Sequence, residues 1–160
     1  MLSIFKKKKI DNSLSAFTSG RVIPIEELED GVFSSKILGD GLAIYSENDE
    51  VVSPGDGEIA TVMESTKHAV GIKMKSGVEI LLHVGIDTVS MEGEGFNLFV
   101  GQGDKVKSGT KLITFNSELV KKKGLNSAVI MVVTNLDEFN SIKYNTNINA
   151  ISNETIIAEI

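Results

Sequence analysis

The chain has 160 residues, of which 41 % are hydrophobic and 24 % charged, the composition of an ordinary globular domain with a core of its own. Its net charge of −6 argues against nucleic-acid binding through phosphate neutralisation. It contains no cysteine, which excludes disulfides, thiolate metal sites and a cysteine nucleophile, and its apolar runs are far shorter than the roughly 20 residues that span a bilayer, so we expect a cytoplasmic protein.

Residues 1–20 are predicted to be a flexible basic extension of the domain. The segment "FKKKKIDNSLSAFTSG" is basic at first, then rich in Ser, Asn and Gly, and has no sustained hydrophobic period. The alternative is a short amphipathic segment, in which Leu2, Ile4 and Phe5 stand beside Lys6–Lys9 and make a peripheral contact with an anionic membrane.

Residues 21–160 are predicted to form one domain, an antiparallel all-β sandwich or barrel-sandwich hybrid. β-Branched residues recur in short runs such as "GEIATVM" and "SAVIMVV", and many of the 15 glycines fall at turn positions between the runs. Two segments are predicted to be short helices. The first, "PIEELEDG", begins at Pro24, and the second, "NSELVKKKG", has a cap at Asn116 or Ser117 and a stop at Gly124.

The chain has only two histidines, His68 and His83, and they flank one predicted hairpin, "HAVGIKMKSGVEILLH". A two-residue turn at Ser76-Gly77 would set Val70 opposite His83. One face of the hairpin would then carry both histidines together with Val70, Ile72, Met74, Glu79 and Leu81. The two imidazoles would lie diagonally across the hairpin, with backbone positions about 7–8 Å apart. A three-residue loop would instead place them on opposite faces.

Two histidines on one face favour a chemical function, and the alternative is a pair of half-buried imidazoles whose hydrogen bonds are satisfied within the fold. Such a pair is typical of a metal site, of a base with its helper, or of a phosphoryl acceptor with a stabilising partner. A phosphoryl acceptor must be a neutral imidazole that presents a lone pair, so its other nitrogen has to hold the proton and donate it. For His83 the expected acceptor of that proton is the backbone carbonyl of Gly85, where glycine lets the chain bend.

The sequence around His83 closely resembles a known signature. "GVEILLHVGIDTV" followed by "EGEGF" resembles the active-site signature of the glucose-class IIA components of the bacterial sugar phosphotransferase system, and "TKHAV" resembles the segment with that family's second histidine. "VFSSKILGDGLAI" resembles the family's docking segment and "GQGDKVKSGTKLITF" its late hairpin. The resemblance runs from about residue 20 to residue 159.

This resemblance implies an all-β phosphocarrier of the phosphotransferase class that needs no cofactor. Such proteins accept a phosphoryl group from HPr and pass it to a cysteine of a IIB domain during sugar uptake. By resemblance His83 is phosphorylated, on Nε2, and His68 is the second active-site histidine, hydrogen-bonded by Thr66. The implied docking ring consists of Phe33, Ile37, Leu81 and Val89, with Asp30 and Asp87 as acidic residues beside it.

One departure from the family pattern lies between Gly57 and His68, where the chain has one residue more than the family. Glu64 stands where the family has an apolar ring residue. We expect Met63 to take that place and a β-bulge to absorb the extra residue.

Three other functions fit parts of the sequence. A zinc enzyme would need a third ligand beside His68 and His83, so we expect no dedicated metal site, although the pair could bind zinc incidentally. A lipoyl- or biotinyl-type carrier would need a displayed hairpin lysine, which "VKSGTK" does not clearly offer. A regulatory protein that binds its targets according to its phosphorylation state would carry the same residues as a transport component.

Overall fold

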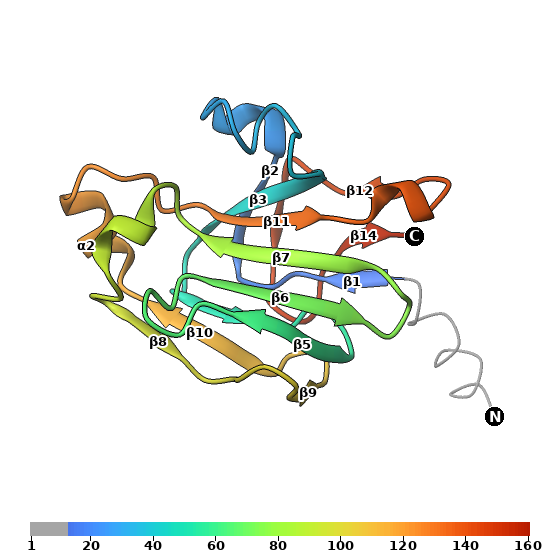
Figure 1. Cartoon of the computed structure of the whole chain (residues 1–160). Helices are drawn as coiled ribbons and strands as arrows, with labels where there is room; N and C mark the ends of the chain where they lie inside the picture. Colours follow the sequence, from blue (N-terminus) through green and yellow to red (C-terminus); the bar gives the residue numbers. More distant parts are fainter. Residues whose placement is uncertain (1–12) are drawn as a thin grey trace.

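The computed structural model describes residues 13–160 of the chain. Within them the chain forms three antiparallel sheets with a few short helices (Figure 1), which confirms the predicted all-β sandwich. The largest sheet has eight strands, in the spatial order β13 (Ile148–Ala150), β2 (Gly20–Pro24), β3 (Asp40–Ser46), β11 (Val129–Val133), β7 (Glu79–Val84), β6 (Ala69–Met74), β5 (Gly57–Val62) and β9 (Lys105–Val106).

Two smaller sheets complete the sandwich. One has the order β4 (Glu50–Val52), β10 (Lys111–Phe115) and β8 (Phe96–Leu98), and the other has the order β1 (Ser13–Ser15), β14 (Ile156–Glu159) and β12 (Lys143–Tyr144). The main core draws on all three sheets. It contains, among others, the buried side chains of Leu14, Ile44, Leu82, Ile113 and Ile157.

Residues 13–20 belong to the folded domain, so the predicted boundary at residue 21 is wrong. Strand β1 pairs with β14, with Leu14 opposite Ala158, and both Leu14 and Phe17 are buried. Small polar neighbours lower the average hydrophobicity of this stretch and hide its apolar positions. Residues 1–12, and the membrane contact predicted for them, lie outside the described residues.

The hairpin that carries His83 has a different register from the predicted one. Its loop has three residues rather than two, since the backbone N–H of Met74 donates to the carbonyl of Val78 at 2.8 Å. Ala69 therefore lies opposite His83, and Gly71 lies opposite Leu81.

The observed register gathers the apolar residues of the hairpin on one face. The main core receives Val70, Ile72, Met74, Val78, Ile80, Leu82 and Val84. The predicted register would have divided this set between the two faces of the sheet. Exposing half of it would cost about 25 cal/mol for each Å² of apolar surface left in water. Val70 and Ile72 are therefore core residues and do not line the histidine site.

Both predicted helical segments are confirmed. The first is the 3₁₀ helix η1 (Ile25–Leu28), which follows Pro24, and the second is the α-helix α2 (Ser117–Lys122). The side chain of Asn116 caps α2 by accepting a hydrogen bond from the Leu119 N–H at 3.0 Å. Two further 3₁₀ turns are η2 (Thr88–Met91) and η3 (Leu136–Glu138). No helix within residues 13–160 has the length and hydrophobicity needed to cross a membrane.

The outer face of the large sheet, which faces away from the main core, carries a second apolar cluster. Ile23 of β2, Ala43 of β3 and Ile130 of β11 lie opposite one another in a row, and His83 of β7 continues it. Helix η1 and the loop at 29–39 lie at the β2–β3 side of the sheet, at the top in Figure 1, and bury Phe33 in this cluster. Strand β7 thus brings His83 to the border of a buried apolar cluster.

Candidate functional site

His68 and His83 lie side by side, as the sequence predicted. Their ring centroids are 4.7 Å apart and the ring planes are perpendicular. His83 comes from the end of β7, and His68 immediately precedes β6. His68 is only 3 % exposed, whereas His83 is half-buried. The two imidazoles form a compact pair from segments that a hairpin joins.

The rings meet although the hairpin loop has three residues, because the chain turns sharply before β6. Lys67 has a φ of 57°, in the left-handed region, and its N–H donates to the carbonyl of Met63 at 2.7 Å. The N–H of Val84 donates to the carbonyl of His68, also at 2.7 Å, so the two segments stay joined beyond the regular strand. The alternation of faces holds only within a pleated strand, and it does not extend across the turn to His68.

The hydrogen bond of His83 fixes which nitrogen is free. Its Nδ1 lies 2.7 Å from the carbonyl oxygen of Gly85, as predicted. A carbonyl can only accept, so Nδ1 carries the proton and the neutral ring has its lone pair on Nε2. Gly85 has a φ of 76°, and a Cβ there would lie 2.8 Å from the Asn126 carbonyl oxygen and still closer to Thr88. Only glycine fits this turn without strain.

His68 has a partner of a different kind. Its Nδ1 lies 2.8 Å from the Thr66 hydroxyl oxygen, the contact that the sequence predicted. A hydroxyl can donate as well as accept, so Thr66 permits the tautomer in which His68 bears its proton on Nε2. No hydrogen-bond partner for either Nε2 atom is found within residues 13–160. His83 is thus restricted to a lone pair on its Nε2, whereas His68 can present an N–H on its own Nε2.

Burial keeps both imidazoles neutral. Burial, together with the neighbouring His68, lowers the pKa of His83 to about 4, while the hydrogen bond to Gly85 and the charges of Asp87 and Asp30 oppose this decrease. Burial also lowers the pKa of His68. The unprotonated form of His83 therefore predominates at neutral pH, although its lone pair belongs to a weaker base than free imidazole.

Phe33 and Asp30 are held in the 29–39 loop next to His83. Phe33 is only 7 % exposed, and its ring centroid lies 5.0 Å from that of His83, so it packs against the site rather than projecting from the surface. The carboxylate of Asp30 accepts hydrogen bonds from the N–H groups of Phe33 and Ser34 at 3.0 and 2.8 Å. Burial tends to raise the pKa of Asp30, but these hydrogen bonds outweigh it and the pKa is lowered. Asp30 therefore stabilises the loop.

Other residues named from the sequence lie at the surface. Ile37 is 77 % exposed and Val89 is 53 % exposed, while Leu81 is partly buried against the second apolar cluster. Asp87 is exposed and has a φ of 61° immediately before η2. Two further exposed apolar side chains, Val32 and Leu38, were not singled out from the sequence, although both lie in the loop that contains Phe33 and Ile37.

A bulge lies between Gly57 and His68, as expected. The pairing of β5 with β6 shifts register between Ile59 and Thr61, so β5 has one residue more than β6 at Ala60. Met63 follows the end of β5, begins the turn that leads to His68, and is exposed. Met63 is thus an apolar surface residue in the segment that supplies the second histidine.

The described residues around the pair do not make a cluster of metal ligands. No group of three or more His, Cys, Asp or Glu side chains in the described part of the chain could hold a metal ion. A groove of about 700 Å³ is lined by residues of β5, β6 and β9 and the turns beside them, and neither histidine lines it. The arrangement supplies a neutral nucleophilic imidazole, a second imidazole that can donate to the same place, and exposed apolar side chains on neighbouring segments.

Comparison with known proteins connects this arrangement to a family. Residues 12–139 match the family model described as phosphoenolpyruvate-dependent sugar phosphotransferase system, EIIA 1. The PTS system glucose-specific EIIA component of Bacillus anthracis is 44 % identical over 153 residues, which cover 96 % of this chain and 92 % of that protein. The PTS system beta-glucoside-specific EIIBCA component of Bacillus subtilis (strain 168) is 43 % identical over 120 residues, which cover 75 % of this chain and 20 % of that protein.

A solved structure has the same fold. The glucose permease IIA from Mycoplasma capricolum is 36 % identical in sequence and superposes with a TM-score of 0.80. The match covers 91 % of this chain and 93 % of that one.

Proposed function

The chain belongs to the EIIA 1 family of the phosphoenolpyruvate-dependent sugar phosphotransferase system, where it has a phosphocarrier role in sugar uptake, and we propose that His83 carries the phosphoryl group on Nε2. HPr is the proposed donor, and a cysteine of a IIB domain is the proposed acceptor, in the cytoplasm. The proposal depends above all on one observation, the hydrogen bond from His83 Nδ1 to the Gly85 carbonyl beside a second imidazole.

Acceptance uses the lone pair of His83. The neutral Nε2 attacks the phosphorus in line with the bond to the donor, and that bond breaks as the new P–N bond forms. The Gly85 carbonyl holds the ring in one tautomer and balances the positive charge that develops on it. The low pKa of His83 makes the ring a good leaving group, because a weaker base is displaced more easily. The same feature therefore favours onward transfer.

His68 stabilises the phosphoryl group beside it. With Thr66 donating to Nδ1, the Nε2–H of His68 can donate to a phosphoryl oxygen on His83. Phosphoryl transfer requires positioning and charge balance more than covalent chemistry from the protein. His68 is thus proposed to be a helper whose contribution grows as the phosphoryl group leaves.

The apolar residues around the pair are proposed to be the docking surface for both partners. Ile37, in the loop that contains Phe33, and Val89, in η2 six residues after His83, are exposed, while Phe33 packs against the His83 ring. Burying such side chains against a partner excludes water from the phosphohistidine during transfer. Asp87 would attract basic groups of the partner and raise the association rate. A relative that is an EIIBCA component supports a IIB domain as the acceptor.

The experiment that tests this function uses the purified protein with phosphoenolpyruvate, Enzyme I and HPr. Mass analysis should find one added phosphoryl group that is lost in acid and that maps to His83. Addition of a IIB domain should then remove the phosphoryl group from the protein. A protein that stays unmodified, or that carries the group on His68, would refute the proposal.

The pH dependence of acceptance should differ from that of a free histidine. His83, with a pKa of about 4 rather than 6.5, should remain unprotonated and reactive toward phosphoramidate, a small P–N donor, down to about pH 5. The measurement is an NMR titration of the His83 ring alongside the phosphorylation rate, corrected for the donor's own decay. A midpoint near 6.5 would contradict the structure.

The same shift predicts how stability changes with acid. The unfolded chain binds a proton at His83 near pH 6.5, whereas the folded chain does so only near pH 4. The unfolded state therefore binds more protons between these values, and the contribution of His83 to the free energy of unfolding falls as pH decreases through this window. Comparing the pH dependence of denaturant unfolding for the protein and for its His83→Gln variant would reveal this term.

Removing the side chain of Ile37, which is 77 % exposed, should weaken docking without affecting the chemistry. We expect Ile37→Ser to raise the KM for phosphorylated HPr about 10-fold, the effect of losing one well-packed apolar contact. Its rate with phosphoramidate should be unchanged. Ile151→Ser is the matched control, because Ile151 is also exposed but lies on the turn before β14. Equal KM values for the two variants would exclude Ile37 from the interface.

A further inference from the structure

The 29–39 loop reaches from η1 to β3 and carries residues of the proposed docking surface. Phe33, packed on His83, comes from its middle, and Ile37 lies near its end. Backbone hydrogen bonds within the loop are few: the Lys36 N–H donates to the Phe33 carbonyl at 3.1 Å, and the Gly39 N–H donates to the Lys36 carbonyl at 3.2 Å. Lys36 is thus bonded through its main chain to the residue that touches His83.

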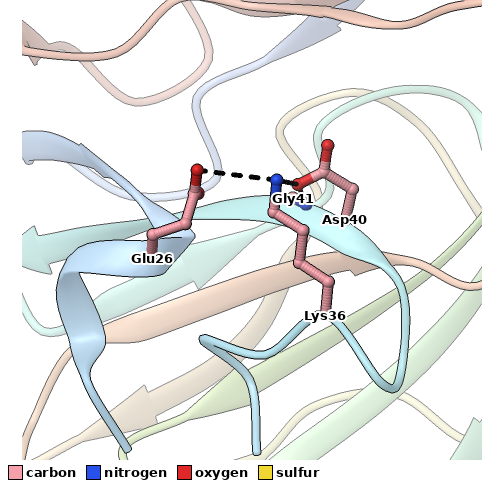
Figure 2. Close-up of polar contacts among 4 residues, drawn as sticks. All are labelled: Glu26, Lys36, Asp40 and Gly41. Atoms are coloured by element: carbon pink, nitrogen blue, oxygen red, sulfur yellow. Dashed lines mark hydrogen bonds and ion pairs between the residues drawn. The ribbon is translucent and has the colours of Figure 1, made fainter. Parts of the chain in front are cut away.

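The side chain of Lys36 connects the two ends of this loop. Its Nζ lies 3.5 Å from Glu26 on η1 and 3.4 Å from Asp40, the first residue of β3 (Figure 2). Asp40 is itself fixed, since the same carboxylate oxygen accepts a hydrogen bond from the Gly41 N–H at 2.9 Å. Asp40 and, less strongly, Glu26 raise the pKa of Lys36 against the effect of burial, so its amino group stays protonated.

The alternative explanation for Lys36 is an ordinary surface ion pair, and single exposed pairs contribute little to stability. Lys36 differs from such a pair in two respects. Its ammonium is shared by two carboxylates from the two elements that bound the loop, and its backbone adopts the left-handed region with a φ of 63°. Without the ammonium, two carboxylates well inside a Debye length of each other would repel and favour opening of the loop.

We propose that Lys36 is a positioning residue for phosphoryl transfer, whose ammonium, shared between Glu26 and Asp40, holds the 29–39 loop so that Phe33 stays packed on His83. This inference depends on the proposed function of His83 but adds a residue that contacts neither the reacting atoms nor the imidazole pair. Through the bond from Lys36 N–H to the Phe33 carbonyl, loosening of the side chain displaces the ring that covers His83.

The test compares two variants. Lys36→Met removes the charge but keeps an unbranched side chain of similar length, and Lys36→Arg keeps the charge. Lys111→Met is the matched control, because Lys111 has a comparable exposed ion pair with Glu50, at 3.5 Å, on β10 and β4. The first readout is the NMR shift of the His83 ring protons, which senses the ring current of Phe33 in the unphosphorylated protein. The chain has only two histidines, so these signals are easily assigned.

For Lys36→Met we expect shifted His83 ring signals and a KM for phosphorylated HPr that is raised about 2- to 5-fold, the range of a lost partly exposed ionic contact. The rate with phosphoramidate should change less than about twofold, since the nucleophile is intact. Lys36→Arg and Lys111→Met should resemble the unsubstituted protein in all three measurements. Lys36→Met behaving like Lys111→Met would overturn the inference. Failure of the unsubstituted protein to accept phosphate would instead refute the proposed function. The NMR comparison would still test whether Lys36 keeps Phe33 packed on His83.

Discussion

The His83→Gln variant is expected to accept no phosphate from phosphorylated HPr, with a loss of at least about 10⁴-fold. Glutamine can retain the hydrogen bond to the Gly85 carbonyl through its amide N–H, but an amide nitrogen has no available lone pair for attack on phosphorus. The fold should persist, because the other face of β7 supplies the core residues. Mass analysis after incubation with phosphoenolpyruvate, Enzyme I and HPr measures the effect.

The control for this variant lies within the same pair. His68→Gln replaces the neighbouring imidazole, 4.7 Å away, and should still accept phosphate. An acid-labile phosphoryl group on the His83→Gln protein would mean that another residue is the carrier. Loss of acceptance in both variants, with the fold intact, would mean that the two histidines act as one unit.

The second large effect is expected in onward transfer. His68→Gln should be phosphorylated on His83 within about tenfold of the normal rate but should pass the group to a IIB domain about 10²- to 10³-fold more slowly, as when one stabilising donor is lost. During acceptance the nucleophile is intact and the donor protein brings charged groups of its own. During release, the departing phosphoryl group depends on the Nε2–H of His68, which is aimed by the contact of His68 Nδ1 with the Thr66 hydroxyl, and a glutamine amide is not held in that position.

Thr66→Val offers a milder version of the same test. It keeps the shape of the side chain but removes the hydroxyl that lies 2.8 Å from His68 Nδ1, so no group is left to donate to Nδ1 when the proton is on Nε2. We expect a slower release in the same direction as His68→Gln but smaller, measured by quenching the transfer from phosphorylated protein to a IIB domain. Normal release rates in both variants would remove His68 from the mechanism.

The juxtaposition of the two histidines was predicted correctly, although the register used to predict it was wrong. The sequence argument assumed a two-residue turn and regular pleating back to His68. The structure has a three-residue loop, and a left-handed residue at Lys67 then returns His68 to the side of His83. Local patterns do not decide between these turns. Burial of the apolar set from Val70 to Val84 on one face decides the register.

Phe33 illustrates what a motif match leaves open. Its segment was recognised as part of a docking surface, but the sequence does not say which apolar residues of "VFSSKIL" point inward. In the structure Phe33 fills the space beside His83, whereas Val32, Ile37 and Leu38 are exposed. The orientation depends on Asp30 accepting the Phe33 and Ser34 N–H groups and on Lys36 reaching η1 and β3.

The sequence by itself determined the all-β class, the two helical segments and the contact of His83 with Gly85, which lies two residues further along the chain. The contact of His68 with Thr66 was implied by the family resemblance. Only the tertiary structure decided the hairpin register, the burial of Phe33, the position of Lys36 and the inclusion of residues 13–20. Each of these depends on competition for burial or charge pairing between segments far apart in the chain, as when Leu14 pairs with Ala158. Such competition is settled by the whole core at once, which no local pattern of residues encodes.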